Sequence, residues 1–136
     1  MSAFVDTSGL YALLVTSERA HPSVVDAFQE LLVGGRLLWT TSYVVLETTA
    51  ILQRRFGLAP VRDLVERIVP VLEVEWVGET LHRRALARLI REDRRELSLV
   101  DYVSFEFMRA EGLRDALALD ADFAVAGYRL LPGVSD

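Results

Sequence analysis

The chain has 136 residues, of which 51% are hydrophobic, so we expect one compact domain spanning residues 1–136 with a sizeable core. It contains no cysteine, which excludes disulfides, thiolate metal sites and a cysteine nucleophile. Twenty acidic residues stand against 15 basic ones, all of them arginine, and the formal net charge of -5 argues against binding a polyanion by bulk positive charge.

Strand-like runs and helical periods alternate along the first half of the chain. Apolar residues recur at helical spacing from Pro22 to Val33, and a Gly-Gly pair follows. Thr41 or Ser42 is placed to cap a long helix that ends near Phe56, before a glycine. The expected elements are strands over 2–6 and 36–40, and helices over 7–15, 22–33, 42–56 and 60–69.

The second half of the chain continues this alternation. Residues 71–77, VLEVEWV, alternate as a strand does, and an amphipathic helix follows from Glu79 to about Arg94. Residues 97–112 predict a further helix closed by Gly112, and the last two strands are expected over 115–119 and 128–132. Strands that alternate with helices predict an α/β fold whose central parallel sheet of about five strands is covered by helices on both faces.

Acidic residues stand where these elements meet. Asp6 ends the first strand, and Asp120 and Asp122 end a later one, so all three are expected at the carboxyl edge of the sheet, where α/β proteins place their chemistry. Glu47 lies on an apolar helix face, where an ionised carboxylate needs a partner or a metal. Asp101 lies in the first turn of its helix, where the helix dipole favours a negative charge.

Helix capping is the alternative explanation for most of these acids. Asp6 and Asp120 are suited to cap the helices that follow them, and Ser98 with Asp101 fits a capping box. Capping leaves Glu47 unexplained. Clustered carboxylates repel each other by about 4 kcal/mol at ~4 Å, and a divalent cation removes that repulsion. An all-oxygen ligand set suits Mg²⁺ or Mn²⁺ better than zinc.

Four segments together resemble the PIN-domain family and, within it, the small VapC-type toxins. They are FVDTSGLYALL, TTSYVVLETTAIL, LSLVDYVSFEFMRAEG and ALALDADFAVAGYRLLP, in the order and at the separations usual for the family. The resemblance implies that Asp6, Glu47, Asp101 and Asp120 form an acidic catalytic cluster that holds Mg²⁺, or Mn²⁺ as a substitute. Asp122 would be an additional or alternative metal ligand.

The same resemblance implies a metal-dependent endoribonuclease, the toxin of a VapBC-type pair, which leaves a 5′-phosphate and a 3′-hydroxyl. It further implies an RNA substrate, a cognate VapB-type antitoxin and a homodimer. Ala118 departs from the family pattern, which has threonine or serine there, so a catalytically degenerate PIN domain that acts as a binding module is the first alternative. A metal-dependent phosphohydrolase of another α/β family is the second, although it leaves Glu47 unexplained.

Side chains outside the acidic cluster complete the expectations. Arginines recur along one helical stripe that could guide RNA, or could be solvated and neutralised by neighbouring acids. Trp39 and Trp76 are expected in the core, and His21 and His82 as structural residues. No signal peptide or apolar run of membrane-spanning length is evident, so we expect a cytoplasmic protein. The stripe comprises Arg84, Arg88, Arg91 and Arg95.

Overall fold

A parallel sheet organises the computed structural model of the chain, which describes residues 2–133. Its five strands in this part of the chain follow the order β3-β2-β1-β4-β5, and every neighbouring pair is parallel. This confirms the predicted fold class. The strands are β1 (Ser2–Val5), β2 (Leu37–Thr41), β3 (Glu73–Glu75), β4 (Asp115–Leu117) and β5 (Arg129–Leu131). The helices are α1 (Thr7–Leu14), α2 (His21–Val33), α3 (Ser42–Phe56), α4 (Ala59–Asp63), α5 (Glu79–Glu92), α6 (Leu99–Glu111) and α7 (Ala121–Val125).

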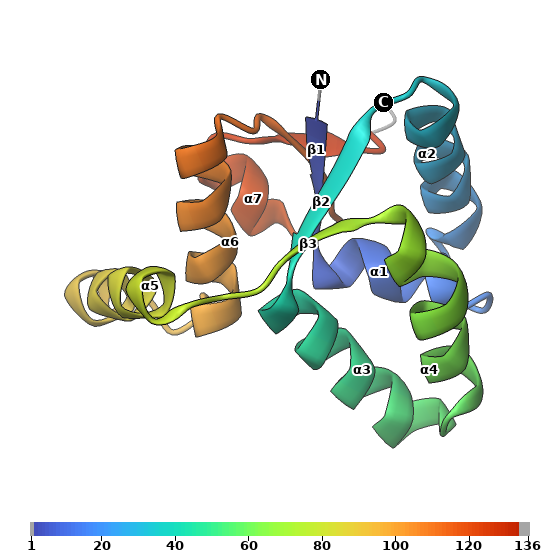
Figure 1. Cartoon of the computed structure of the whole chain (residues 1–136), viewed down its shortest axis with the longest axis horizontal. Coiled ribbons are helices and arrows are strands. Elements are labelled where there is room, and N and C mark those ends of the chain that lie inside the picture. Colours follow the sequence, from blue (N-terminus) through green and yellow to red (C-terminus); the bar gives the residue numbers. More distant parts are fainter. Residues whose placement is uncertain (1, 134–136) are drawn as a thin grey trace.

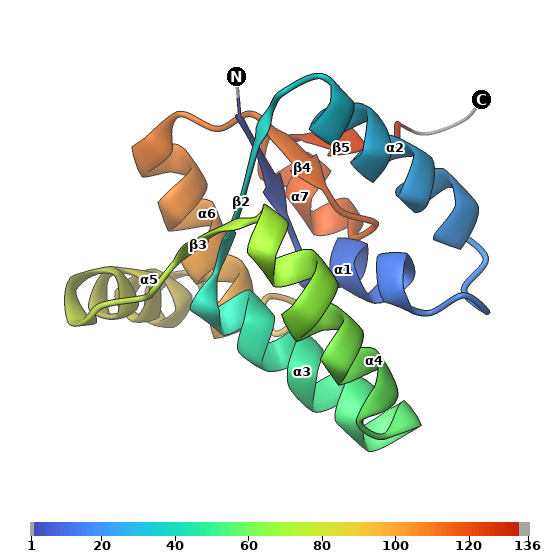
Figure 2. The same cartoon turned by 45° about the vertical axis from the view of Figure 1, so that its right-hand side comes forward.

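Helices lie on both sides of the sheet, as Figures 1 and 2 show. α2 lies on one side, and α6 with α7 lies on the other. α5 packs on α6, and α3 runs beside α4 away from the end of β2. The amino-terminal ends of α1, α3 and α7 follow directly from the ends of β1, β2 and β4, so these helix starts gather at the carboxyl edge of the sheet.

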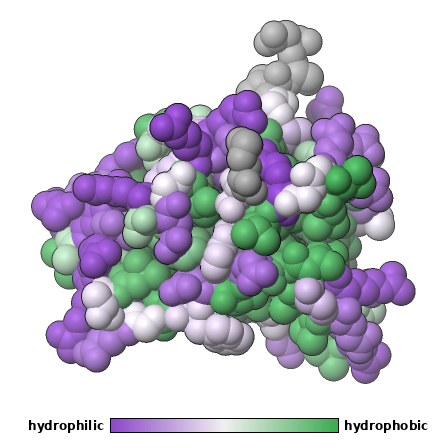
Figure 3. Space-filling model, turned by 45° about the horizontal axis from the view of Figure 1, so that its top comes forward, coloured by the Kyte–Doolittle hydropathy of each residue, from purple (hydrophilic) through white to green (hydrophobic). Residues whose placement is uncertain are grey.

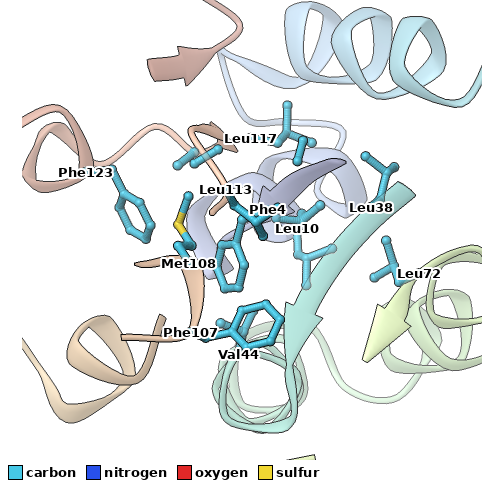
Figure 4. Close-up of a cluster of buried hydrophobic side chains, with 14 of the residues drawn as sticks. Phe4, Leu10, Leu38, Val44, Leu72, Phe107, Met108, Leu113, Leu117 and Phe123 are labelled. Carbon is cyan, nitrogen blue, oxygen red and sulfur yellow. The ribbon is translucent and has the colours of Figure 1, made fainter. Parts of the chain in front are cut away.

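The core fills the space between the sheet and its helices. Phe4 on β1 packs against Phe107 on α6 and Phe123 on α7, with ring centroids 6.1 and 6.4 Å apart. Figure 4 shows these three rings around Met108, with Leu10 and Leu117 on the other side of Phe4. Phe123 is fully buried, as expected for a residue that packs beneath the carboxylates before it. This packing fixes α7 against the sheet.

Gly9 lets α1 approach the sheet closely. A Cβ atom at this position would clash with the backbone carbonyl oxygen of Leu117 on β4. Only glycine therefore fits where α1 crosses β4. The close contact holds the start of α1, and Asp6 before it, over the end of β4.

Two expected elements differ from the structure in detail. The predicted helix over 60–69 is α4 followed by a π-helical turn (Leu64–Ile68) and a 3-10 turn (Val69–Val71), so the α-helical hydrogen bonding stops at Asp63. The predicted strand over 71–77 pairs only at Glu73–Glu75. Trp76 lies beyond this pairing with 76% of its surface exposed, so its placement in the core was wrong. Trp39, by contrast, packs on Phe107 at 5.6 Å.

The opposite edge of the sheet is closed by an ion-pair cluster. Asp115 is buried at the start of β4, and its carboxylate pairs with Arg36 at 2.8 Å and with Arg129 at 3.1 Å. Arg36 also donates a hydrogen bond to the backbone carbonyl of Ser2. These contacts tie β1, β4 and β5 to the loop before β2, and they neutralise a charge that would otherwise be costly to bury.

The outer surface carries apolar patches between polar side chains, as the face in Figure 3 shows. Among the helices within residues 2–133, none combines the length and the apolar character that a membrane span requires.

Candidate active site

Three aspartates cap helices at the carboxyl edge of the sheet. Asp6 is the N-cap of α1 and accepts hydrogen bonds from the backbone N–H and the hydroxyl of Ser8, at 3.3 and 2.9 Å. Asp120 is the N-cap of α7 and accepts from the N–H of Asp122 at 2.9 Å. Asp101 forms the predicted capping box with Ser98 at the start of α6. The capping interpretation is therefore correct for all three residues.

The same three aspartates also line one cavity, together with Glu47. The cavity measures about 300 Å³ and opens to solvent between the starts of α1, α6 and α7 and the side of α3. Capping and clustering are thus not alternatives here, because each cap directs its carboxylate toward a shared space. The lining residues are Asp6, Thr7, Ser8, Tyr11, Glu47, Ile51, Arg55, Ser98, Asp101 and Asp120.

Burial in the cavity raises the pKa of two of its aspartates. Burial raises the pKa of Asp6 from 3.8 to about 7, and the negative charge of Asp101 contributes to the rise. Burial also raises the pKa of Asp101, helped by the charges of Asp120 and Glu47. A site that disfavours its own negative charges in this way favours a cation among them.

The donor chemistry of the cavity fits a hard divalent ion. The hydrogen bonds that cap the helices use one oxygen of each aspartate, namely Oδ2 of Asp6, Oδ2 of Asp101 and Oδ1 of Asp120. The second oxygen of each carboxylate is left for another ligand. Thr7 contributes a buried hydroxyl that has no hydrogen-bond partner within residues 2–133. Carboxylate and hydroxyl oxygens are ligands that suit Mg²⁺ and Mn²⁺.

The acidic side chains share one cavity, but they are not arranged around a single point as metal ligands are. Across residues 2–133, no group of three or more acidic or histidine side chains is positioned as a set that could hold a metal ion. Asp122 does not line the cavity, and desolvation together with the charge of the neighbouring Asp120 raises its pKa. Binding an ion therefore requires these side chains to close in around it, with the oxygens that the capping hydrogen bonds leave free as ligands.

One row of side chains on α3 forms a wall of the cavity. Glu47, Ile51 and Arg55 are spaced four residues apart and all face it. The guanidinium of Arg55 donates to the hydroxyl of Tyr11 at 2.9 Å and lies 5.5 Å from the centroid of its ring. Arg55 thus brings a positive charge to the cavity while a neutral partner holds it. The sequence reading missed Arg55 and Tyr11, although the spacing from Glu47 was visible.

Ser8 is a third residue that was not predicted from the sequence. Its hydroxyl donates to Asp6 and accepts a 2.9 Å hydrogen bond from the N–H of Leu119, between β4 and α7. Ser8 therefore connects the first acid of the chain to the loop that carries Asp120. Ala118, where a hydroxyl was expected, is buried directly after β4.

The arginine stripe expected along 84–95 is not continuous. Arg88 turns inward, pairs with Glu92 at 2.7 Å and lies 5.3 Å from the ring centroid of Tyr102. α5 ends at Glu92, so Arg95 lies beyond the helix. Arg84 and Arg91 remain exposed. His21, in agreement with a structural role, is hydrogen bonded to the carbonyl of Ala12 at 2.7 Å.

Comparisons with known proteins agree with the fold and identify the family. The family model described as "PIN domain" matches residues 3–127. The 23S rRNA-specific endonuclease VapC20 of Mycobacterium tuberculosis is 36% identical over 126 residues, which cover 92% of this chain and 94% of that protein. Its crystal structure, described as a Sarcin-Ricin loop cleaving toxin, superposes with a TM-score of 0.80 over 93% of this chain and 96% of the other.

Two more distant structures share the fold alone. PAE2754 from Pyrobaculum aerophilum superposes with a TM-score of 0.67 at 16% identity, covering 97% of this chain and 90% of the other. FitAcB from Neisseria gonorrhoeae superposes with a TM-score of 0.69 at 12% identity, covering 94% and 95%.

Proposed function

Because this chain belongs to the PIN-domain family, we propose that it is an endoribonuclease and the toxin of a toxin–antitoxin pair. The observation that carries the proposal is the cavity in which Asp6, Glu47, Asp101 and Asp120 converge from four separate elements. The cavity is open and large enough to admit a phosphodiester group. Its carboxylates repel a phosphate unless a cation lies between them.

We assign the divalent ion of this proposal to Mg²⁺, with Mn²⁺ as a substitute. Asp6, Glu47, Asp101 and Asp120 would hold it, with Asp122 as an additional or alternative ligand. When bound, such an ion lowers the pKa of a water molecule and stabilises the charge of the departing oxygen during in-line displacement.

The chain's own residues contribute position and charge. Ser8 and Ser98 fix one oxygen of Asp6 and of Asp101, so that the other oxygen faces the cavity in a defined direction. Thr7 offers a hydroxyl beside Asp6 that can hold a water molecule. Arg55 supplies donors for a phosphate oxygen at the end of the cavity remote from Glu47 along α3.

We propose the sarcin-ricin loop of 23S rRNA as the substrate. VapC20 is a 23S rRNA-specific endonuclease that cleaves the sarcin-ricin loop, and 36% identity over almost the whole of both chains supports the same target here. An exposed RNA loop offers unstacked bases, which suits a cavity at the open edge of a sheet.

Incubation with intact ribosomes is the direct test of this activity. With Mg²⁺ present, we expect one cut in 23S rRNA, with a 5′-phosphate and a 3′-hydroxyl at the new ends, mapped by primer extension and end labelling. Naked ribosomal RNA and a ribosomal RNA with an altered loop serve as controls. Absence of cleavage in every RNA would favour the degenerate binding module, which the alanine at position 118 had suggested.

A VapB-type antitoxin and a homodimer are the partners that we propose from family membership. Apolar side chains at the connection from α3 to α4 and in the π-helical turn after α4 offer a surface for such contacts, since Phe56, Leu58 and Val65 are all exposed. An antitoxin segment bound there could extend to Arg55 and cover the cavity.

Replacing Ser8 with alanine tests the positioning of Asp6. The variant loses the hydrogen bond to Asp6 and the one from Leu119, so we expect cleavage to fall about 10- to 100-fold, as for other residues that orient metal ligands. The free energy of unfolding should fall by only about 1–2 kcal/mol. Initial cleavage rates and urea unfolding measure the two effects.

The matched control is Ser23→Ala, because Ser23 also hydrogen bonds to the backbone but lies on α2, away from the cavity. A loss of stability without a loss of cleavage in the Ser8 variant would contradict the role assigned to this hydroxyl.

A further inference from the structure

A second pocket adjoins the acidic cavity and shares Glu47 with it. This pocket also measures about 300 Å³, and it lies between the first turns of α3, α5 and α6. Its remaining lining is Tyr43, Leu46, His82, Leu99 and Val100. We propose, building on the ribonuclease function above, that this pocket receives an unpaired nucleobase adjacent to the scissile phosphate.

Continuity along α3 is the first argument. Tyr43, Glu47 and Arg55 lie on one row of the helix, at intervals of four and eight residues. The pocket, the acidic cavity and the guanidinium of Arg55 therefore follow one another along α3. A strand whose phosphate lies among the acids passes the pocket within the reach of one nucleotide. The row thus has the apolar pocket at one end and, at the other, an arginine that can bind phosphate.

The chemistry of the pocket distinguishes a base from a phosphate. No arginine lines it, and apart from Glu47 its polar groups are the hydroxyl of Tyr43 and the ring of His82. These two lie 2.6 Å apart in a hydrogen bond, with their rings edge to face at 5.9 Å. When Tyr43 donates to Nδ1, the Nε2–H of His82 is free to donate to a base edge. Apolar walls with a few fixed polar groups are typical of sites for small heterocycles.

The apolar rim of the pocket is open to solvent at Leu46. Leu46 is 68% exposed at the rim, beside the aromatic pair. Aromatic and apolar surfaces of this kind stack on single-stranded bases, and one stacked base changes affinity by about 5- to 150-fold. The pocket therefore selects for an unstacked nucleotide and contributes to the choice of cleavage site.

Binding of RNA from which single bases have been removed tests the proposal. The probe is a short single-stranded RNA spanning the mapped cut, with an abasic nucleotide placed at each position in turn. Fluorescence anisotropy with the Asp6→Asn protein measures affinity without cleavage. We expect one position next to the cut at which removal of the base weakens binding about tenfold.

Variants in the pocket must remove this dependence. In Leu46→Ala and His82→Ala proteins that also carry Asp6→Asn, the intact RNA should bind about tenfold more weakly, and the abasic position should no longer matter. Ile90→Ala is the matched control, since Ile90 on α5 is 69% exposed and does not line the pocket. Circular dichroism checks that each variant folds.

The outcomes separate this inference from the proposed function. Failure of the unmodified protein to cut any RNA overturns the function. If the unmodified protein cuts RNA but both pocket variants bind RNA with unchanged affinity, only the base pocket is overturned. Conversion of a dimer to a monomer by Leu46→Ala, seen by light scattering, also overturns the base pocket, because a second copy then covers this surface.

Discussion

An Asp6→Asn variant is expected to lose RNA cleavage and to become more stable at pH 8 in the absence of divalent cations. Cleavage should fall at least about 100-fold, because loss of residues that merely orient metal ligands already costs 10- to 100-fold. The gain in stability follows from removing a buried negative charge whose pKa is raised to about 7. Asparagine retains an oxygen that can accept the hydrogen bonds of Ser8.

The sign of this effect depends on pH. Asp6 binds its proton more tightly in the folded protein than in the unfolded chain, where its pKa is 3.8. Its contribution to folding is therefore most favourable below pH 4 and is lost as the pH rises through about 7. The difference corresponds to at most about 4 kcal/mol above pH 7, so the variant should gain a few kcal/mol at pH 8 and little at pH 4. Urea unfolding at both pH values measures it.

Asp115→Asn is the matched control for this prediction. Asp115 is also buried, but Arg36 and Arg129 pair with it, so its replacement leaves Arg36 without a carboxylate partner and should cost about 3 kcal/mol. One Asp→Asn change should thus stabilise and the other destabilise at pH 8. If Asp6→Asn were as destabilising as Asp115→Asn, or if it cut RNA at the normal rate, the role of Asp6 would be refuted.

Local sequence signals predicted most of the fold because they act within a few residues. Thr41 caps α3, Gly57 and Gly112 follow helix ends, and the alternation of elements left a parallel sheet as the only compact arrangement. The short helix α7 follows directly from its cap at Asp120. Where tertiary contacts determine the length of an element or the burial of a side chain, the local sequence pattern gave a wrong prediction. Trp76 follows the strand alternation, yet β3 stops pairing one residue earlier and leaves it exposed.

In the acidic site, too, residues marked by local signals were predicted and residues that depend on distant contacts were not. Strand ends and helix starts indicated Asp6, Asp101 and Asp120, and an apolar helix face indicated Glu47, so the four acids of the cavity were all identified. Ser8 and Arg55 were missed because their roles depend on distant partners, namely the N–H of Leu119 and the hydroxyl of Tyr11. Local spacing in the sequence cannot predict contacts between residues that are 111 or 44 positions apart.

The prediction of a continuous arginine stripe was wrong for the same reason, because contacts with another helix decide where one arginine lies. Its spacing is helical, but Arg88 lies over Tyr102 and Phe105 on the neighbouring helix α6. Aromatic rings thus take one member of the stripe out of solvent. Arg55, held by the hydroxyl of Tyr11, is the arginine among the residues that line the acidic cavity.

Divalent cations should stabilise the protein and be required for its activity. A ligand that binds only the folded state at 100 times its dissociation constant adds about 2.7 kcal/mol, which for a chain of this size raises Tm by about 8 °C. We expect a shift of this order with saturating Mg²⁺ or Mn²⁺, measured by calorimetry, and loss of cleavage in EDTA. Glu47→Gln and Asp6→Asn proteins should show little of the shift, while exposed Asp26→Asn should keep it.

The pH dependence of this shift distinguishes site binding from a general salt effect. Below about pH 7, a cation must displace the proton of Asp6, so its apparent affinity falls by up to about tenfold for each further pH unit. The shift in Tm at a fixed, subsaturating Mg²⁺ concentration should therefore be clearly smaller at pH 6 than at pH 8. Surface carboxylates are ionised at both pH values, so screening by bulk cations predicts equal shifts. Equal shifts, or cleavage that persists in EDTA, would refute a metal site built on Asp6.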